Sequence, residues 1–146
     1  MKKRLVILYL FLHTVAVSWA QNDTIFTRTV YNSENDIYMI MDFQKKSLTL
    51  PGQDFMGEMA GYIGDYQDAR KWLILDAEII DEHNASLSIV NDECSEDLEA
   101  IITYNEDGTY TLKQGEGSTI KIVRNRKWKK LPKQIIFTKK RDIPVY

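Results

Sequence analysis

The sequence predicts an all-β, single-domain protein, an antiparallel meander of about eight or nine strands that closes or nearly closes into a barrel. Three observations lead to this prediction. Short runs rich in β-branched and aromatic residues recur along the chain, apolar and polar residues alternate within them, and polar turn sequences separate them at even spacing. Residues 71–104 show all three features most clearly. Closure is expected because it removes the exposed edges that an open meander leaves.

The first two strands are predicted in residues 24–31 and 36–43, with the turn sequence Asn-Ser-Glu-Asn between them. The second run alternates so regularly that one of its faces is expected to be buried. The apolar residues of that face are Ile37, Met39, Met41 and Phe43. A shorter alternation follows and ends at Pro51 and Gly52, a pair that interrupts strands.

Residues 57–64 contain three glycines within one predicted strand. Because glycine weakens a strand, its presence there predicts a bulge, a sharp bend or the close approach of another backbone. Barrels use such positions to turn corners. Residues 65–69 are then expected to form no more than one helical turn.

The block that begins at Lys71 is the next predicted strand. Its buried face is predicted to consist of Leu73, Leu75, Ala77 and Ile79. Trp72 and Ile74 lie on the opposite face, so the start of this strand is expected to be covered on both sides. Leu87 and Ile89 continue the buried face in the strand that follows.

Residues 95–104 fit two patterns. Ser95 can cap a helix whose apolar residues recur at helical spacing. The same segment alternates as a strand through Leu98, Ala100, Ile102 and Tyr104. We favour the strand, because the following sequence Asn-Glu-Asp-Gly is typical of a hairpin and leads directly into another alternating run.

The last third of the chain is predicted to hold three further strands. The residues expected to point inward are Tyr110, Leu112, Ile120 and Ile122. Residues 115–117 are expected to turn the chain, residues 124–132 to be irregular, and residues 134–140 to form the final strand.

Residues 1–20 have the features of a secretory signal peptide. A basic start precedes an apolar centre, and small residues at Ser18 and Ala20 predict cleavage after Ala20. The apolar centre is shorter than the about 20 residues that a membrane span needs. The remaining residues, 21–146, match the size of one domain. An exported protein, periplasmic or secreted, without a transmembrane segment is therefore predicted.

Charge is distributed unevenly along the chain. Three of the 19 basic residues lie in the predicted signal, so residues 21–146 contain more acidic than basic residues. No Lys or Arg occurs between Asp76 and Asp107, and no acid occurs between Lys121 and Arg141. The basic stretch can serve an anionic partner, or adjacent strands can neutralise one another across the sheet. We favour neutralisation.

The residues that carry most enzyme chemistry are scarce. His83 is the only histidine beyond the signal, and Cys94 is the only cysteine. A predicted strand about 20 Å long separates them, whereas a nucleophile and its base need to lie about 3 Å apart. We expect His83 to be an exposed turn residue and Cys94 an unpaired thiol. Zinc-ligand spacings, calcium loops and phosphate loops are absent from the sequence, so we predict no enzyme, no metal site and no cofactor.

The strand count, the export signal and the polar hairpins together resemble small lipocalin-like (calycin) β-barrels. The resemblance is architectural, because the Gly-x-Trp motif of lipocalins is absent: Trp72 follows Arg70 and Lys71 and lies in mid-chain. No family residue is carried over. The resemblance implies an interior that is either filled by side chains or holds one small ligand. The inward residues are expected to be apolar residues and tyrosine, without a charge.

The leading functional hypothesis is a non-enzymatic exported binding protein with a small apolar ligand in the interior or mouth of the barrel. Methionine is adaptable enough to line such a pocket. The candidate ligand-binding residues are Met39, Met41, Met59, Tyr62, Trp72, Tyr110 and Trp128.

The alternative hypothesis is a protein-interaction module, an inhibitor or a cell-envelope accessory protein, that acts through its outer face or its basic C-terminal end. Lys127, Lys129 and Lys130 surround Trp128 and are the candidate anion or partner patch. No specific binding to nucleic acid is predicted.

Overall fold

The computed structural model describes residues 25–142, so the predicted signal peptide and its cleavage site lie outside the described residues. Within this range the chain forms ten strands and one short 3-10 helix, without an α-helix. In chain order the elements are β1 (Thr27–Asn32), β2 (Ile37–Asp42), η1 (Asp54–Met56), β3 (Gly61–Asp65), β4 (Trp72–Ile79), β5 (Asn84–Asn91), β6 (Asp97–Tyr104), β7 (Tyr110–Gly117), β8 (Lys121–Arg124), β9 (Lys127–Lys130) and β10 (Gln134–Phe137).

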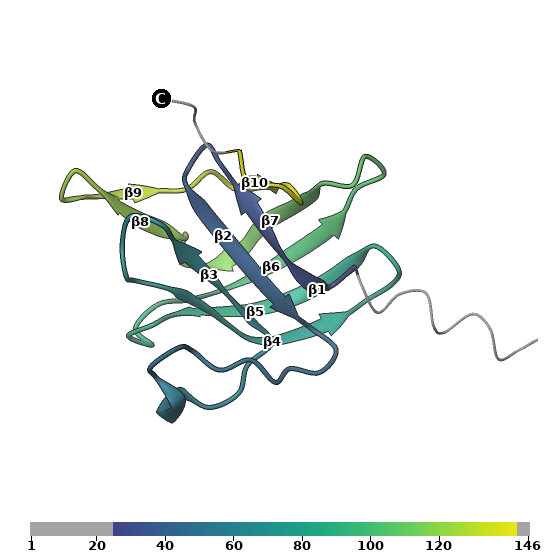
Figure 1. Ribbon diagram of the computed structural model, residues 1–146, viewed down its shortest axis with the longest axis horizontal. Helices are drawn as coiled ribbons and strands as arrows, with labels where there is room; N and C mark the ends of the chain where they lie inside the picture. Colours follow the sequence, from purple (N-terminus) through teal and green to yellow (C-terminus); the bar gives the residue numbers. More distant parts are fainter. Residues whose placement is uncertain (1–24, 143–146) are drawn as a thin grey trace, which may run out of the picture.

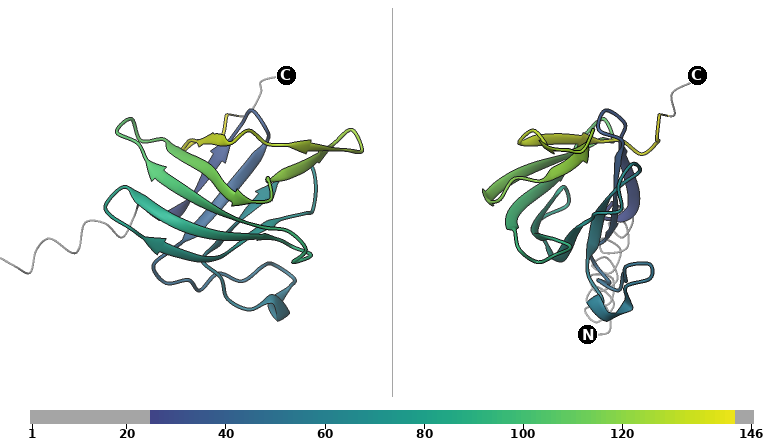
Figure 2. Two further views of the ribbon diagram at one scale, coloured as in Figure 1. Left: turned by 180° about the vertical axis from the view of Figure 1, so that it is seen from behind. Right: turned by 90° about the vertical axis from the view of Figure 1, so that its left-hand side faces the viewer.

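Eight of these strands form one antiparallel sheet that curls into a nearly closed barrel (Figures 1 and 2). Strands β1 to β7 follow one another as a meander, and β10 pairs with β7. The two edge strands meet where the Tyr31 N–H donates to the Thr138 carbonyl at 2.8 Å and the Thr138 N–H donates to the Tyr31 carbonyl at 2.7 Å. The predicted all-β meander is therefore confirmed, and its arrangement is consistent with a calycin-like architecture.

The inward side chains pack as a single hydrophobic cluster that draws on strands from β1 to β10. The predicted alternation of β2 is confirmed, because its apolar face is buried throughout. The inward positions predicted in the last third of the chain are also buried. Burying each large apolar side chain stabilises the fold by about 1.5–3 kcal/mol, which makes this cluster the main source of stability.

Residues 97–104 form strand β6, as favoured over the helix. Leu98, Ala100 and Ile102 alternate into the core, and β6 pairs with β5 on one side and with β7 on the other. A helix at this position would leave the backbone groups of both neighbouring strands without partners, which is costly inside a protein.

The predicted faces of β4 are wrong before the bulge that the strand contains and at the bulge itself, whereas Ala77 beyond it is buried in the core as predicted. Trp72 and Ile74 face the barrel core, and the pairing with β5 then shifts between Ile74 and Asp76. The extra residue is Leu75, which is 47% exposed where burial was expected. Ile79 pairs with the buried Ala85, yet it lies at the strand end and is 38% exposed.

Leu73 is fully buried, but on the outer side of the barrel wall. It belongs to a second, smaller cluster beneath the segment that joins β2 to β3, together with Leu50, Met59 and Tyr62. The expectation that the start of β4 is covered on both sides is therefore confirmed. The joining segment also carries η1, and residues 65–69 form no helical turn, which is within the predicted limit of one.

The glycines of β3 permit a close approach between strands, as the sequence suggested. A Cβ atom on Gly61 would lie 2.2 Å from the backbone oxygen of Ile40, far inside van der Waals contact. One on Gly64 would lie 2.2 Å from the ring of Tyr38. The absence of a side chain at both positions is what lets β2 and β3 pack at this distance.

One inward position carries a charge, contrary to the expectation for the interior. Arg28 pairs with the buried Met41 and lies on the same face of β1 as Val30. Its Nε atom is buried and has no hydrogen-bond partner among the described residues. The Arg28 side chain lies beside Tyr110, and the hydroxyl of Tyr110 donates to the carbonyl of Ile25.

Two predictions for the C-terminal third are wrong. Strand β7 runs through Gly117, so the chain turns after residues 115–117 and not within them. Residues 124–132 are not irregular, because β8 and β9 pair as a separate two-stranded hairpin that projects at one end of the barrel (Figure 1). The turn residues Asn125 and Arg126 have φ angles of 54° and 63°, typical of the hairpin turn whose twist matches that of the strands.

Candidate functional site

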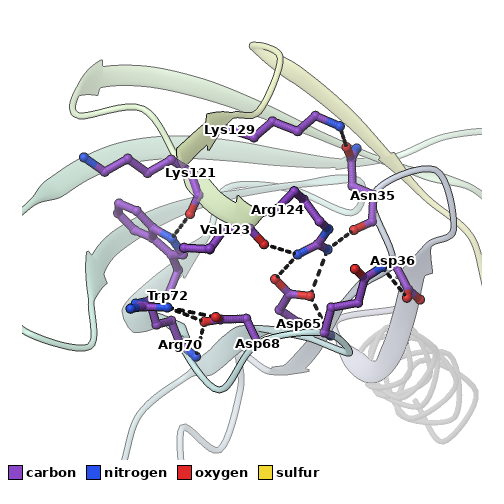
Figure 3. Close-up of polar contacts among 11 residues, drawn as sticks. Asn35, Asp36, Asp65, Asp68, Arg70, Trp72, Lys121, Val123, Arg124 and Lys129 are labelled. Atoms are coloured by element: carbon purple, nitrogen blue, oxygen red, sulfur yellow. Dashed lines mark hydrogen bonds and ion pairs between the residues drawn. The ribbon is translucent and has the colours of Figure 1, made fainter. Parts of the chain in front are cut away.

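Polar contacts hold the β8–β9 hairpin against the end of the barrel (Figure 3). The two terminal nitrogens of Arg124 donate to both carboxylate oxygens of Asp65, at 2.7 and 2.9 Å. Arg124 also donates to the Asn35 carbonyl at 2.6 Å, and Lys129 donates to the Asn35 side chain at 3.1 Å. The carboxylate of Asp65 is only 5% exposed. This two-point pairing is strong and fixes the orientation of the hairpin.

Two further residues attach the base of the hairpin. The indole nitrogen of the buried Trp72 donates to the Lys121 carbonyl at 3.0 Å. The buried Gln114 amide accepts from the Ile120 N–H at 2.7 Å and donates to the Pro132 carbonyl at 2.8 Å. Gln114 therefore ties together the two chain segments that lead into and out of the hairpin, which makes β8 and β9 a rigid extension of the barrel.

A cleft of about 140 Å³ lies between the hairpin and the connections that join β3 to β4 and β5 to β6. Its floor is apolar and includes Ile63, Trp72 and Ile122, all buried. Pockets for drug-sized ligands usually measure about 300–1,000 Å³. The cleft is therefore the size of one side chain or a small fragment.

The walls of the cleft carry paired charges. Arg70 contacts Asp68 at 2.8 Å, and Lys121 contacts Glu96 at 3.0 Å. A hydrogen bond from the Arg70 backbone, together with the Arg70 guanidinium, lowers the pKa of Asp68 below its ordinary value. Asp68 therefore stays ionised and holds Arg70 at the lip of the cleft.

Trp128 stands at this lip and is 59% exposed. The guanidinium of Arg70 lies 5.3 Å from the centre of its ring, and the ammonium of Lys121 lies 5.2 Å from it. Cations at this distance are attracted to the face of an indole ring. The two contacts restrain the orientation of Trp128 and still leave more than half of its surface open to a partner.

The bases around Trp128 are largely left to solvent. All four residues of β9 are exposed, as is Arg126 in the turn. Within residues 25–142, one ion pair joins the acidic and the basic stretch of the chain, that between Lys121 and Glu96. The predicted neutralisation of the acidic stretch by the basic stretch is therefore seen at one ion pair. Lys127 and Lys130 form no ion pair with described residues.

The structure divides the seven predicted ligand-binding residues among three places. Met39, Met41 and Tyr110 belong to the packed core of the barrel. Met59 and Tyr62 belong to the outer cluster. Trp72 and Trp128 line the cleft.

The sequence did not indicate the residues that position the hairpin. Arg124 and Asp65 are 59 positions apart, and neither belongs to a motif. The charge asymmetry marked the basic stretch that contains Arg124, but periodicity is a local property and identifies no partner across such a distance.

The residues considered for catalysis lie apart from each other, and neither lines the cleft. His83 is exposed in the turn between β4 and β5, as expected, and Cys94 is exposed in the connection between β5 and β6. They lie at opposite ends of β5. Over residues 25–142 there is no group of three His, Cys, Asp or Glu side chains that could hold a metal ion.

Comparison with protein-family models, with curated proteins and with solved structures finds no match for this chain. The described part of the chain contains no helix that is both long and apolar enough to span a membrane. Because a fold hosts many functions, the function has to be inferred from the chemistry of the site.

Proposed function

We propose that this protein is an exported, non-enzymatic binding module that engages a protein partner through the β8–β9 hairpin. The observation that carries this proposal is Trp128, a large aromatic side chain that is 59% exposed on a hairpin with firm attachments. Tryptophan and arginine are the residues most enriched among those that dominate binding energy at protein interfaces. A preorganised anchor also lowers the entropic cost of association.

The charges around Trp128 indicate the class of partner. Arg126, Lys127 and Lys130 are exposed beside it and form no ion pair with described residues. Arg70 and Lys121, which lie against its ring, are already paired with Asp68 and Glu96. A surface of this kind attracts an acidic partner and speeds the encounter with it. Binding is accordingly expected to weaken as salt concentration rises, because these charges are screened.

The lipocalin-like hypothesis of an apolar ligand inside the barrel takes second place. Met39, Met41 and Tyr110 are at most 2% exposed and pack within one continuous cluster. Because protein interiors are packed as densely as organic crystals, a ligand at these side chains would have to displace some of them. Mass spectrometry of organic extracts from the purified protein tests this hypothesis, since a stoichiometric small molecule would restore it to first place.

The hairpin proposal can be tested by crosslinking in the cells that produce the protein. A photoreactive amino acid replaces Trp128 in one variant and Ile136 in a matched control, because Ile136 is a comparably exposed apolar residue, at 45%, on β10. We expect a discrete crosslinked product from position 128 and none from position 136. The product should disappear when Lys127 and Lys130 are both changed to Glu. Equal products from both positions, or none from position 128, would contradict the proposal.

A further inference from the structure

The hydrogen bonding of the β8–β9 hairpin determines which of its backbone groups point outward. In a hairpin with a two-residue turn, the pair next to the turn exchanges hydrogen bonds, and pairs then alternate along the strands. Arg124 and Lys127 are that first pair. The alternation continues to the base of the hairpin, where the Leu131 N–H donates to the Ile120 carbonyl at 2.8 Å. The pairs that exchange no hydrogen bonds are Val123–Trp128 and Lys121–Lys130. The backbone N–H and C=O groups of these four residues therefore point to the two outer edges of the hairpin.

The outer edge of β8 is occupied by side chains of the protein itself. Its outward carbonyls belong to Lys121 and Val123. The first accepts from the Trp72 indole at 3.0 Å, and the second accepts from Arg124 at 2.8 Å. These contacts close β8 to any additional strand.

The outer edge of β9, in contrast, is not occupied by side chains of the described residues. Trp128 and Lys130 direct their N–H and C=O groups along it, and these groups have no hydrogen-bond partner among the described residues. The edges of the main sheet differ, because β1 and β10 meet at Tyr31 and Thr138. Within the described range, β9 is thus a short strand whose outer edge has free backbone N–H and C=O groups.

We propose that the partner binds by adding a strand to β9, and that the added strand is an extended acidic segment. This inference rests on the proposed function and specifies how the hairpin would be used. Pairing with a strand edge supplies affinity through backbone hydrogen bonds and specificity through alternate side chains. Lys127 and Lys129 project on one face of β9, and Trp128 and Lys130 project on the other.

The charge of β9 selects between possible occupants. A second copy of β9 would place lysine beside lysine, and like charges on neighbouring strands are destabilising. Lysines on an edge strand commonly prevent self-association for this reason. A strand with alternating acidic residues would instead place carboxylates beside Lys127 and Lys129 on one face of β9 and apolar side chains beside Trp128 on the other, so the same lysines that exclude a second copy favour this partner.

The first test uses the wild-type protein and two synthetic peptides. One is a short peptide of alternating glutamate and valine with a fluorescent label, and the other is the same peptide with every backbone nitrogen methylated. Both carry the same charge, but the second cannot donate backbone hydrogen bonds. We expect the methylated peptide to bind at least roughly tenfold more weakly by fluorescence anisotropy, because several hydrogen bonds are lost. Equal affinities would overturn strand addition.

The second test changes the edge of β9 and keeps its pairing with β8. Lys130→Pro removes an outward N–H, which an edge strand tolerates, and Lys130→Gln removes the same charge but keeps that donor. We expect Lys130→Pro to bind the unmethylated peptide roughly tenfold more weakly than Lys130→Gln. The ratio should persist at high salt, where the contribution of charge is screened. Equal binding by the two variants would overturn the proposal, and thermal unfolding of both shows that each is folded.

The outcomes separate this inference from the proposed function. If the crosslink at Trp128 forms in cells but Lys130→Pro matches Lys130→Gln, the hairpin is an interface that uses side chains and strand addition is overturned. If the crosslink is absent, the proposed function itself fails. Concentration-dependent self-association of the wild-type protein that is lost in Lys130→Pro would overturn the acidic partner in favour of a second copy, and sedimentation measures it directly.

Discussion

Replacing Leu73 and Leu75 separately by alanine should produce very different losses of stability. Leu73 is fully buried in the outer cluster, whereas Leu75 is 47% exposed at the bulge of β4. A regular strand would put these two residues on one face, where they would respond alike. The pair therefore tests the bulge directly.

The magnitudes follow from burial. Replacing a buried leucine by alanine costs about 2–5 kcal/mol, and the cost is lower where the surroundings can collapse into the cavity. The outer cluster is small and lies beneath an irregular segment, so we expect Leu73→Ala to cost about 2–3 kcal/mol. Leu75→Ala leaves no enclosed cavity and should cost less than about 1 kcal/mol.

Urea denaturation followed by circular dichroism measures both losses. For a slope of about 1–3 kcal/mol per molar urea, Leu73→Ala should lower the midpoint by about 1 M or more, and Leu75→Ala should shift it only slightly. The slope itself should not change, because neither variant alters the extent of the fold. Equal losses, or a larger loss at Leu75, would refute the bulge and restore the regular alternation.

Three other predictions concern single positions. Burial raises the pKa of Tyr110 from 10 to about 12, so between these pH values the native state keeps a proton that the unfolded chain releases; wild-type stability should fall over that range, and Tyr110→Phe should show a smaller fall, since burial also raises the pKa values of Tyr38, Tyr62 and Tyr66. Gly61→Ala should cost about 2 kcal/mol or more in a urea melt, because its Cβ would collide with a backbone oxygen 2.2 Å away. Gly57→Ala meets no atom within 4 Å, so its cost, about 1–3 kcal/mol, measures backbone conformation alone at φ 77° and ψ −171°. Arg124→Ala leaves the buried carboxylate of Asp65 without its partner, which should cost about 2–3 kcal/mol and expose the hairpin to limited proteolysis.

The sequence alone predicted the strands and most of their buried faces. In β2, β5, β6 and β7 the alternation of apolar and polar residues agrees with the observed burial. Such alternation is encoded within each strand, because successive side chains of an extended backbone point to opposite sides. The glycines of residues 57–64 predicted a bulge, a bend or a close approach, and the structure shows a close approach at Gly61, where a Cβ would meet the backbone of Ile40.

The sequence also drew attention to Trp128 and its lysines, through composition and not through geometry. Their exposure on a fixed hairpin was not predicted, because Asn125-Arg126 lacks the glycine that usually marks a two-residue turn. Without a recognisable turn, residues 124–132 were predicted to be irregular, and the candidate ligand-binding residues were predicted to share one site in the interior or mouth of the barrel.

Tertiary structure decided the features that depend on distant parts of the chain. The bulge at Leu75 exists only in relation to the pairing of β4 with β5, so no pattern within β4 reveals it. Likewise, Arg124 meets Asp65 because the closing sheet brings the end of β3 beneath β8. Alternation follows from the geometry of one extended strand, whereas bulges, ion pairs and open edges follow from which strands lie side by side, and that is set only when the whole barrel packs around its core.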